Sequence, residues 1–289
     1  MTARTPQTGR GALRVGVSPA GAVLSLATAL LLVFLLLPLA AVFAKVVPVD
    51  NVADYLGRPV VTQALRLSFV TTAISLAVIL ALGTPAAYLL ARYRFPGSAV
   101  LDTLLDLPMV LPPAVAGVAL LMAFGRKGVL GGPLEGLGLE LAFTTAAVVM
   151  AQVFVASPFY VRAARAGFES VDRELERVSA TLGRSRLETF LRVTVPLSLP
   201  ALVGGAVMAW ARALGEFGAT IMFAGNTPGR TQTMPLAIYM ALQEDTTAAL
   251  VLAGILVVVS FAILLVFKVL VRRSVLGGPG AGAAGGGYA

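Results

Sequence analysis

The sequence of residues 162–196 is RAARAGFESVDRELERVSATLGRSRLETFLRVTVP, and this stretch decides how the rest of the chain is interpreted. It holds seven arginines, whereas the two runs beside it, 142–161 and 197–223, are almost wholly apolar. Charge enclosed between two long apolar runs is typical of a surface loop in a protein embedded in a lipid bilayer. We interpret 162–196 as a docking surface on the cytoplasmic side.

The composition of the whole chain agrees with a membrane location. Hydrophobic residues make up 58% of the 289 residues, charged residues only 12%, and the mean hydropathy is +0.90. Soluble domains carry about 25% charged residues. The chain has no cysteine and no histidine, which excludes thiol chemistry, imidazole bases and the usual zinc sites.

A helix needs about 20 consecutive apolar residues to cross roughly 30 Å of hydrocarbon. Six segments meet this requirement, so the sequence predicts an all-α multi-pass membrane protein with six transmembrane helices. The predicted spans are 20–43, 67–91, 107–124, 142–161, 197–223 and 248–271. The first span also resembles a secretory signal peptide, but its apolar core is longer than the roughly 7–15 residues of such a region. Prolines 85, 108, 112 and 113 are expected to bend the second and third spans.

Most of the 22 Lys and Arg residues lie on the side of the membrane that holds the N-terminus. The positive-inside rule therefore predicts that both termini of this multi-pass protein are cytoplasmic. The same positions explain the net charge of +8, so we expect no nucleic-acid binding. Residues 1–19 and 272–289 are expected to be disordered cytoplasmic tails around a transmembrane domain at 20–271.

The first half of the cytoplasmic segment predicts a short amphipathic helix with defined ends. Asp172 is a suitable N-cap, and Gly183 supplies the backbone freedom that a helix end requires. Between them, Leu175, Val178 and Leu182 recur at helical spacing and form one apolar face. The alternative is an amphipathic loop that lies on the lipid surface.

A second short helix is predicted directly after the first. The sequence from Ser185 to Glu188 is a capping box, which starts a helix. We expect this helix to stop before Pro196, so that the two helices and their glycine corner form a compact unit.

Part of this unit resembles a known motif. Glu176, Ala180 and Gly183, followed by VTVP at 193–196, resemble the cytoplasmic EAA loop of ABC-importer permeases. Gly183 and Pro196 keep the spacing of that motif, while 177–179, Arg-Val-Ser, occupy the E-A-A positions themselves and Glu176 stands one place earlier.

Two further stretches are similar to molybdate permeases, the ModB group. They are ARALGEFGAT at 211–220 and NTPGRTQTMPLAIY at 226–239. Sulfate permeases share much of the first stretch, so a sulfate permease is the alternative. The resemblance implies a type I importer permease of the bacterial inner membrane that works as a homodimer. It also implies ABC ATPase subunits on the cytoplasmic side and an extracytoplasmic oxyanion-binding protein that delivers molybdate or tungstate.

No phosphate-binding G-x-x-x-x-G-K-[ST] loop occurs in the chain, so we expect a non-catalytic subunit without a cofactor of its own. ATP and Mg are then expected on the partner ATPase, and the helix at 172–182 is the predicted coupling element. Its apolar face would fill a groove on the ATPase, with Glu176 in a charged rim. The predicted coupling residues are Asp172, Leu175, Glu176, Ser179, Ala180, Gly183 and Pro196.

Arg212 and Glu216 are charged residues within a predicted span, and intramembrane charge indicates a functional site by default. Their four-residue spacing predicts that they share one helix face, with Thr220 a turn further. They are expected either to line the translocation pathway or to form a buried structural pair. A self-contained secondary transporter would normally need more midplane carboxylates, and a simple membrane anchor would need no such pair.

Two further expectations concern packing and the membrane boundary. Asp102 and Asp106 are expected to form a solvated boundary near the inner end of the third span. Gly204 and Gly205 are small residues suited to close contact between helices.

Overall fold

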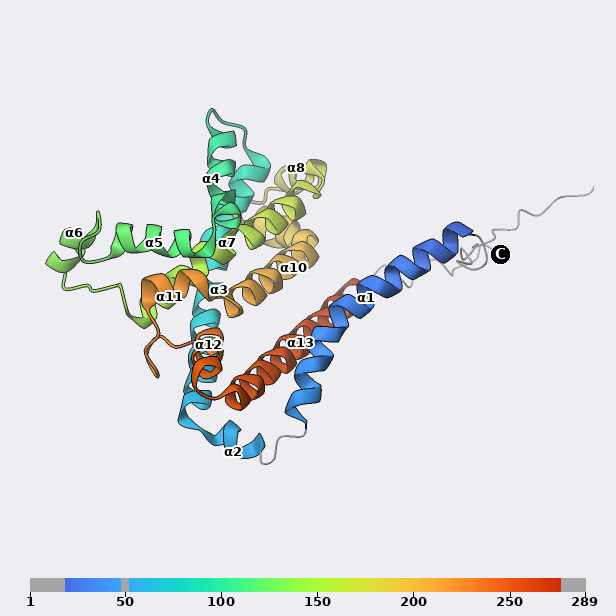
Figure 1. Ribbon diagram of the computed structural model, residues 1–289. Helices are drawn as coiled ribbons and strands as arrows, with labels where there is room; N and C mark the ends of the chain where they lie inside the picture. The colour runs from blue at the N-terminus through green and yellow to red at the C-terminus, as the bar shows by residue number, and fades with distance from the viewer. Residues whose placement is uncertain (1–18, 48–51, 277–289) are drawn as a thin grey trace, which may run out of the picture. The chain divides into compact units, whose positions relative to one another are not determined.

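The structure is a computed structural model that describes residues 19–47 and 52–276. All regular elements in these ranges are helices, as the sequence predicts, and they divide into one unit that holds α1 and a second that holds all later helices (Figure 1). The elements are α1 (Pro19–Val46), α2 (Val52–Gly57), α3 (Pro59–Arg92), α4 (Ser98–Val110), α5 (Pro113–Phe124), α6 (Gly131–Gly136), α7 (Thr145–Glu169), α8 (Arg173–Thr181), α9 (Arg186–Thr189), the π-helix η1 (Phe190–Thr194), α10 (Val195–Leu214), α11 (Gly218–Ala224), α12 (Met234–Glu244) and α13 (Thr246–Leu276).

Five helical runs in the described ranges are long and apolar enough to cross a membrane. They overlap five of the six predicted spans. The runs are Ala20–Val46, Pro59–Arg92, Thr145–Glu169, Arg186–Leu214 and Thr246–Leu265.

The predicted span at 107–124 is not one straight helix. It covers the end of α4 and all of α5, and these two helices meet at an angle of 117°. Leu111 and Pro112 have extended backbone between them, because a residue before proline is pushed out of the helical region and proline has no N–H to donate. The expected bend is therefore a break, and α4 and α5 together make a sixth span only if the pair is counted as one.

Two other boundaries differ from the prediction. α7 continues to Glu169, well past the predicted end of its span at residue 161. α13 continues to Leu276, into the expected tail at 272–289. The remainder of that tail, and residues 1–18 of the other, lie outside the described residues.

α7 is the central helix of the second unit, and it packs most extensively against α3 and α10. Apolar residues of these three helices form one core cluster, with Ile79 of α3, Phe168 of α7 and Leu202 of α10 among them. A second cluster joins α7 to α5 and α11. Figure 1 shows α8 and the start of α4 at one end of this unit and α2 and α12 at the other.

A polar seam that the sequence did not predict runs between α3 and α7. Ser75 Oγ donates to Gln152 Oε1 at 2.8 Å, and Gln152 Nε2 donates to Thr71 Oγ1 at 3.2 Å. All three side chains are buried. Such hydrogen bonds associate helices where lipid supplies no hydrophobic driving force, so the seam fixes the register of α3 against α7.

α7 and α10 approach each other closely because of two glycines. A Cβ added at Gly205 of α10 would lie 2.7 Å from Ala163 Cβ, and one at Gly167 of α7 would lie 2.6 Å from Ala201 Cβ. Neither distance is compatible with normal packing. A Cβ at the neighbouring Gly204 would meet nothing within 4 Å, so only one of the two adjacent glycines is needed for the contact.

This difference predicts opposite effects of the same substitution at adjacent positions. Gly205→Ala is expected to destabilise the chain by about 1–3 kcal/mol through overpacking. Gly204→Ala should be neutral or stabilising, since alanine favours helix over glycine by roughly 0.5–1 kcal/mol. Thermal unfolding of the full chain in detergent, followed by Trp210 fluorescence, measures both. Equal melting temperatures for the two variants would contradict the close approach of α7 and α10.

Candidate functional site

α8 begins and ends with the residues that the sequence indicates. Asp172 is its N-cap, and Asp172 Oδ1 accepts a hydrogen bond from the Glu174 N–H at 2.9 Å. The helix ends at Thr181, and Gly183 follows with φ of +81°, a conformation that strains any residue with a Cβ. These two residues give α8 fixed ends.

The segment after α8 differs from the prediction. The capping box of Ser185 and Glu188 is present and starts α9, but the helix does not stop before Pro196. Instead, η1 connects α9 to α10 in one continuous run. The Val195 N–H bonds to Phe190 O, five residues back, and this wider turn changes the hydrogen-bond register just before Pro196, which has no N–H to contribute. α8 is therefore joined through a short stiff segment to the membrane helix α10.

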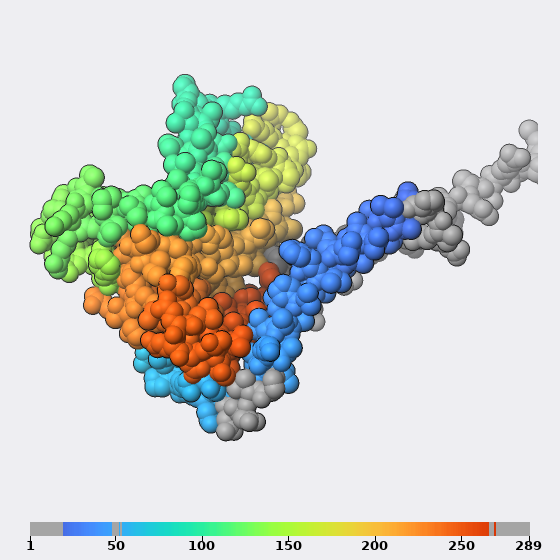
Figure 2. Space-filling model, in the orientation of Figure 1, coloured from blue at the N-terminus to red at the C-terminus, as the bar shows by residue number. Residues whose placement is uncertain are grey.

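The predicted apolar face of α8 is uncovered in the described structure. Leu175, Val178 and Leu182 are all exposed, and they border a shallow groove that continues to Pro196 and Leu197. Figure 2 shows α8 at the surface of the second unit, next to α4. An exposed apolar stripe on a short charged helix is typical of a surface that binds another protein.

Glu176 lies on a different face and points into the protein. Its Oε1 accepts hydrogen bonds from Arg92 Nη2 and from Thr194 Oγ1, each at 2.7 Å. Arg92 Nη2 also donates to Val171 O at 3.1 Å. The Arg92 and Glu176 side chains are only 7% and 19% exposed. One carboxylate thus ties α8 to the end of α3 and to η1, and we call Arg92, Glu176 and Thr194 the clamp.

The clamp corrects one prediction and adds two residues to the site. Glu176 was expected in a charged rim around the docking face, but its charge is used inside the chain. Arg92 was counted only as a charge that sets orientation, and Thr194 was not singled out. The one signal in the sequence for this inward direction is that Glu176 stands one residue before the E-A-A positions of the motif. On a helix, a shift of one residue turns a side chain by about 100°.

The other predicted coupling residues divide between the interior and the surface. Ser179 is buried, and its hydroxyl lies 2.9 Å from the Thr189 hydroxyl, so it braces α8 against α9. Ala180 and Pro196 are exposed. Ser179 therefore supports the shape of the loop, while Ala180 and Pro196 are open to a partner.

Arg212 and Glu216 form an ion pair, with Arg212 Nη1 2.7 Å from Glu216 Oε2. They do not lie on one continuous helix, because α10 ends at Leu214 and α11 begins at Gly218. Glu216 is 1% exposed, and its Oε1 accepts a hydrogen bond from the Ala219 N–H at 2.8 Å. The pair therefore fastens the junction between α10 and α11, and the expected continuous span at 197–223 is broken there.

Thr220 is in α11, beyond this junction, and does not extend the face of α10 as predicted. Its side chain is fully buried, and Thr220 Oγ1 has no hydrogen-bond partner in the described structure. The structure thus brings Arg212 and Glu216 together and leaves Thr220 on a separate short helix.

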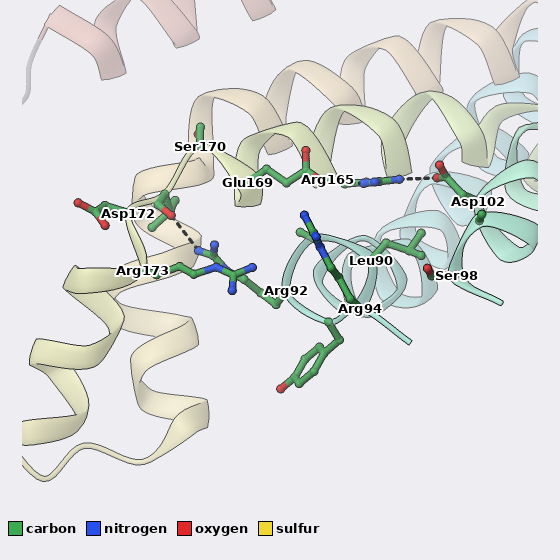
Figure 3. Close-up of a pocket in the computed structure, with 14 residues that line it drawn as sticks. Leu90, Arg92, Arg94, Ser98, Asp102, Arg165, Glu169, Ser170, Asp172 and Arg173 are labelled. Carbon is green, nitrogen blue, oxygen red and sulfur yellow. Dashed lines mark hydrogen bonds and ion pairs between the residues drawn. The ribbon is translucent and has the colours of Figure 1, made fainter. Parts of the chain in front are cut away.

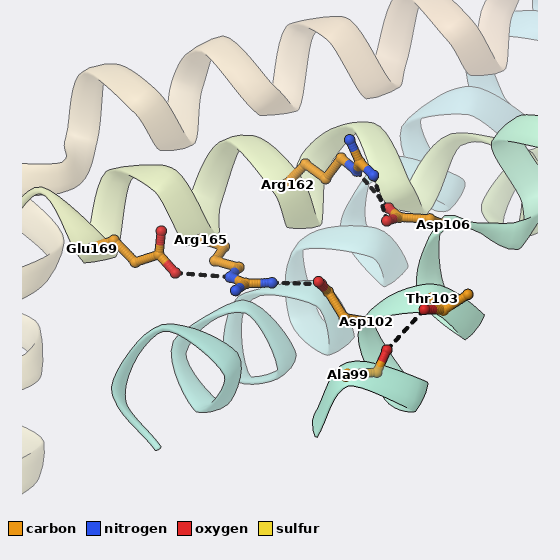
Figure 4. Close-up of polar contacts among 7 residues, drawn as sticks. All are labelled: Ala99, Asp102, Thr103, Asp106, Arg162, Arg165 and Glu169. Atoms are coloured by element: carbon orange, nitrogen blue, oxygen red, sulfur yellow. Dashed lines mark hydrogen bonds and ion pairs between the residues drawn. The ribbon is translucent and has the colours of Figure 1, made fainter. Parts of the chain in front are cut away.

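Asp102 and Asp106 were expected at a solvated boundary; both side chains are partly exposed, and each also pairs with an arginine of α7 (Figure 4). Asp106 receives two hydrogen bonds from the Arg162 guanidinium, and Asp102 accepts one from Arg165 Nη1 at 2.5 Å. Arg165 Nε also donates to Glu169 at 2.8 Å. These pairs join the charged face of α7 to α4, while the apolar face of α7 beyond residue 161 still packs in the core.

A cavity of about 800 Å³ lies between the ends of α3 and α7 and the start of α4. Figure 3 shows Arg92 bonded to the backbone beyond α7, Arg165 bonded to Asp102, and Arg94 in the space between α3 and α7. In the described part of the chain, no three His, Cys, Asp or Glu side chains gather as a metal site. Polar contacts thus hold the ends of α3 and α7 and the start of α4 together.

Comparisons with known proteins agree with this architecture. Residues 83–275 match the family model of the binding-protein-dependent transport system inner membrane component. The molybdenum transport system permease protein ModB of Mycobacterium tuberculosis is 44% identical over 81% of this chain and 88% of its own length. The sulfate transport system permease protein CysT of Salmonella typhimurium is 36% identical over 88% of this chain and 93% of its own.

Among solved structures, a bacterial alginate ABC transporter in complex with an alginate pentasaccharide-bound periplasmic protein contains a similar chain. The TM-score is 0.69 at 16% sequence identity, with 87% of this chain and 93% of that chain covered. The helical spans and the short helix between α7 and α10 therefore define a permease of the ABC-importer class. The chain belongs to the family of binding-protein-dependent transport system inner membrane components.

Glu174 and Glu176 both lie on α8 and both pair with an arginine, but the clamp predicts that Glu176 matters more for the stability of this helix. Glu176→Gln should speed amide hydrogen exchange across residues 173–182 by roughly tenfold or more, since a buried hydrogen bond to a charged group is worth about 1.5–3 kcal/mol. Glu174→Gln removes an exposed pair with Arg177 and should change little. Equal protection of α8 in both variants, measured by mass spectrometry, would refute the clamp.

Proposed function

We propose that this chain is the channel subunit of an ATP-driven importer for molybdate or tungstate, and that α8 receives the motion of a partner ATPase. The observation that carries this proposal is the division of α8 into two working faces. Leu175, Val178 and Leu182 are exposed for docking, while Glu176 is bound inside the chain by the clamp. A helix that is open on one face and fixed on another is suited to transmit force.

The clamp determines where a displacement of α8 would go. Arg92 is the last residue of α3, and Thr194 is the last residue before α10. A displacement of α8 would therefore pull on the ends of both membrane helices together. The breaks between α4 and α5 and between α10 and α11 divide the spans into shorter pieces, which allows one end of the pathway to move while the other stays packed.

Partners supply the remaining parts of this importer. ATP and Mg are bound by ABC ATPase subunits, because the chain has no phosphate-binding loop. A second copy of the chain completes the pathway, and an extracytoplasmic binding protein delivers the oxyanion. The solved alginate transporter is in complex with a periplasmic protein, which supports the last of these partners. In this arrangement α8 and both termini face the cytoplasm.

The choice of molybdate over sulfate rests on the relatives. Identity is higher to the molybdenum permease than to the sulfate permease, 44% against 36%. Either substrate is a tetrahedral dianion, so the chain needs a positive charge near the pathway that attracts the ion without trapping it. Arg212 meets this need: its side chain is partly exposed, and Glu216 neutralises part of its charge.

The docking face predicts a specific loss of coupling. Leu175→Ala combined with Val178→Ala should weaken ATPase binding by about 2–5 kcal/mol if these residues are the anchors of the interface. Oxyanion-stimulated ATP hydrolysis in a reconstituted complex should fall with it. Val129→Ala, which truncates an even more exposed apolar residue between α5 and α6, is the control.

Two outcomes of this reconstitution would overturn the proposal. One is full ATPase binding and stimulation in the double variant. The other is uptake of the oxyanion by this chain alone, driven by an ion gradient, which would identify a secondary transporter.

The role of Arg212 can be separated from its structural pairing with Glu216. Arg212→Gln leaves a buried carboxylate without its partner, which costs roughly 3–5 kcal/mol. The double variant Arg212→Gln/Glu216→Gln removes both charges, so we expect complex assembly to recover while oxyanion uptake remains low. Recovery of uptake together with assembly would show that the pair is only a brace.

A further inference from the structure

A second cavity, on the opposite side of α8 from the groove at Pro196, is not used by the proposed coupling mechanism. It has a volume of about 640 Å³ and lies between α3, α8 and α9. Four arginines from α8 and the start of α9 stand around it. They are Arg173, Arg177, Arg184 and Arg186. We call this space the arginine cavity.

The positive charge around the arginine cavity is only partly compensated, with Glu188 attracting Arg184 from outside the lining. Arg177 pairs with Glu174 at the surface, but Arg173, Arg184 and Arg186 form no salt bridge in the described part of the chain. The one acid that lines the cavity, Glu176, is already bonded to Arg92 and Thr194. The cavity therefore favours an anionic ligand.

The inner wall of the cavity is apolar and belongs to a membrane span. Pro85 and Tyr88 of α3 form it together with Phe190, whose ring centroid lies 4.8 Å from that of Tyr88. Pro85 is seven residues before the end of α3, so this wall extends about 10 Å along the span from the helix end. An anion with an apolar chain matches both parts of the cavity, whereas a free inorganic anion would leave the wall uncovered.

We propose that the arginine cavity binds an anionic phospholipid, with the phosphate among the arginines and an acyl chain along Pro85 and Tyr88. Clusters of arginine at the ends of membrane helices attract anionic head groups by about 1 kcal/mol per residue. The site goes beyond the proposed function, because it lies on a face of α8 that the ATPase does not use in that scheme. A bound lipid would connect α8 to the bilayer next to the clamp.

Native mass spectrometry of the purified full chain tests this site. Phosphatidylglycerol should bind more tightly than phosphatidylcholine. Arg184→Gln/Arg186→Gln should weaken phosphatidylglycerol binding roughly thirtyfold, the product of two such contributions. Arg184→Lys/Arg186→Lys, which keeps the charge, should retain it. The matched control is Arg66→Gln/Arg230→Gln, which removes two exposed arginines that lie away from the cavity and form no salt bridge in the described chain.

Several results would overturn the proposal. They are equal binding of the two lipids, unchanged binding in the Arg184→Gln/Arg186→Gln variant, or an equal loss in the control. Displacement of the lipid by inorganic phosphate would assign the cavity to a free anion, and displacement by the ATPase subunit would assign it to the protein interface. Because none of these readouts depends on transport, the lipid site can fail while the importer function stands, and the reverse also holds.

Discussion

The contact between Glu176 and Arg92 is the interaction on which the rest of this account depends. It is a partly buried ion pair, and it is shared with Thr194 and with the backbone at Val171. Breaking such a pair leaves a charge without its partner in a poorly solvated place, which is costly. The short helix α8 is therefore not a mobile surface loop. Its position is fixed by bonds to the end of α3 and to the residue just before α10.

Other ion pairs of the second unit also hold one helix to the next. Arg162 and Arg165 hold α7 to α4, and the Arg212–Glu216 pair holds the junction of α10 and α11. Between these points, small residues bring α7 and α10 close together. The result is a tightly packed centre whose spans are broken between α4 and α5 and between α10 and α11, and the proposed channel would move at these breaks.

The sequence predicts the features that depend on neighbouring residues. Apolar runs locate the spans, and Asp172, Gly183 and the Ser185–Glu188 box locate the ends of the short helices. Features that depend on distant residues were not predicted. A pair such as Asp106 and Arg162 is visible only after α4 turns back on α7, and the inward direction of Glu176 depends on where α3 ends. The break at Leu111 is an intermediate case, because the neighbouring prolines predict that the helix bends there but not the angle of the bend.

Spin-label distances test most directly whether α8 moves as one body with α3. Because the chain has no cysteine, single labels can be placed at the exposed positions Thr181 and Arg94 without removing native residues. In the proposed assembly of two copies with ATPase subunits, the distance between these labels within one chain should stay constant when ATP binds, while the distance between the Thr181 labels of the two copies changes. A change of several ångströms within one chain, with α8 moving away from the end of α3, would contradict the account.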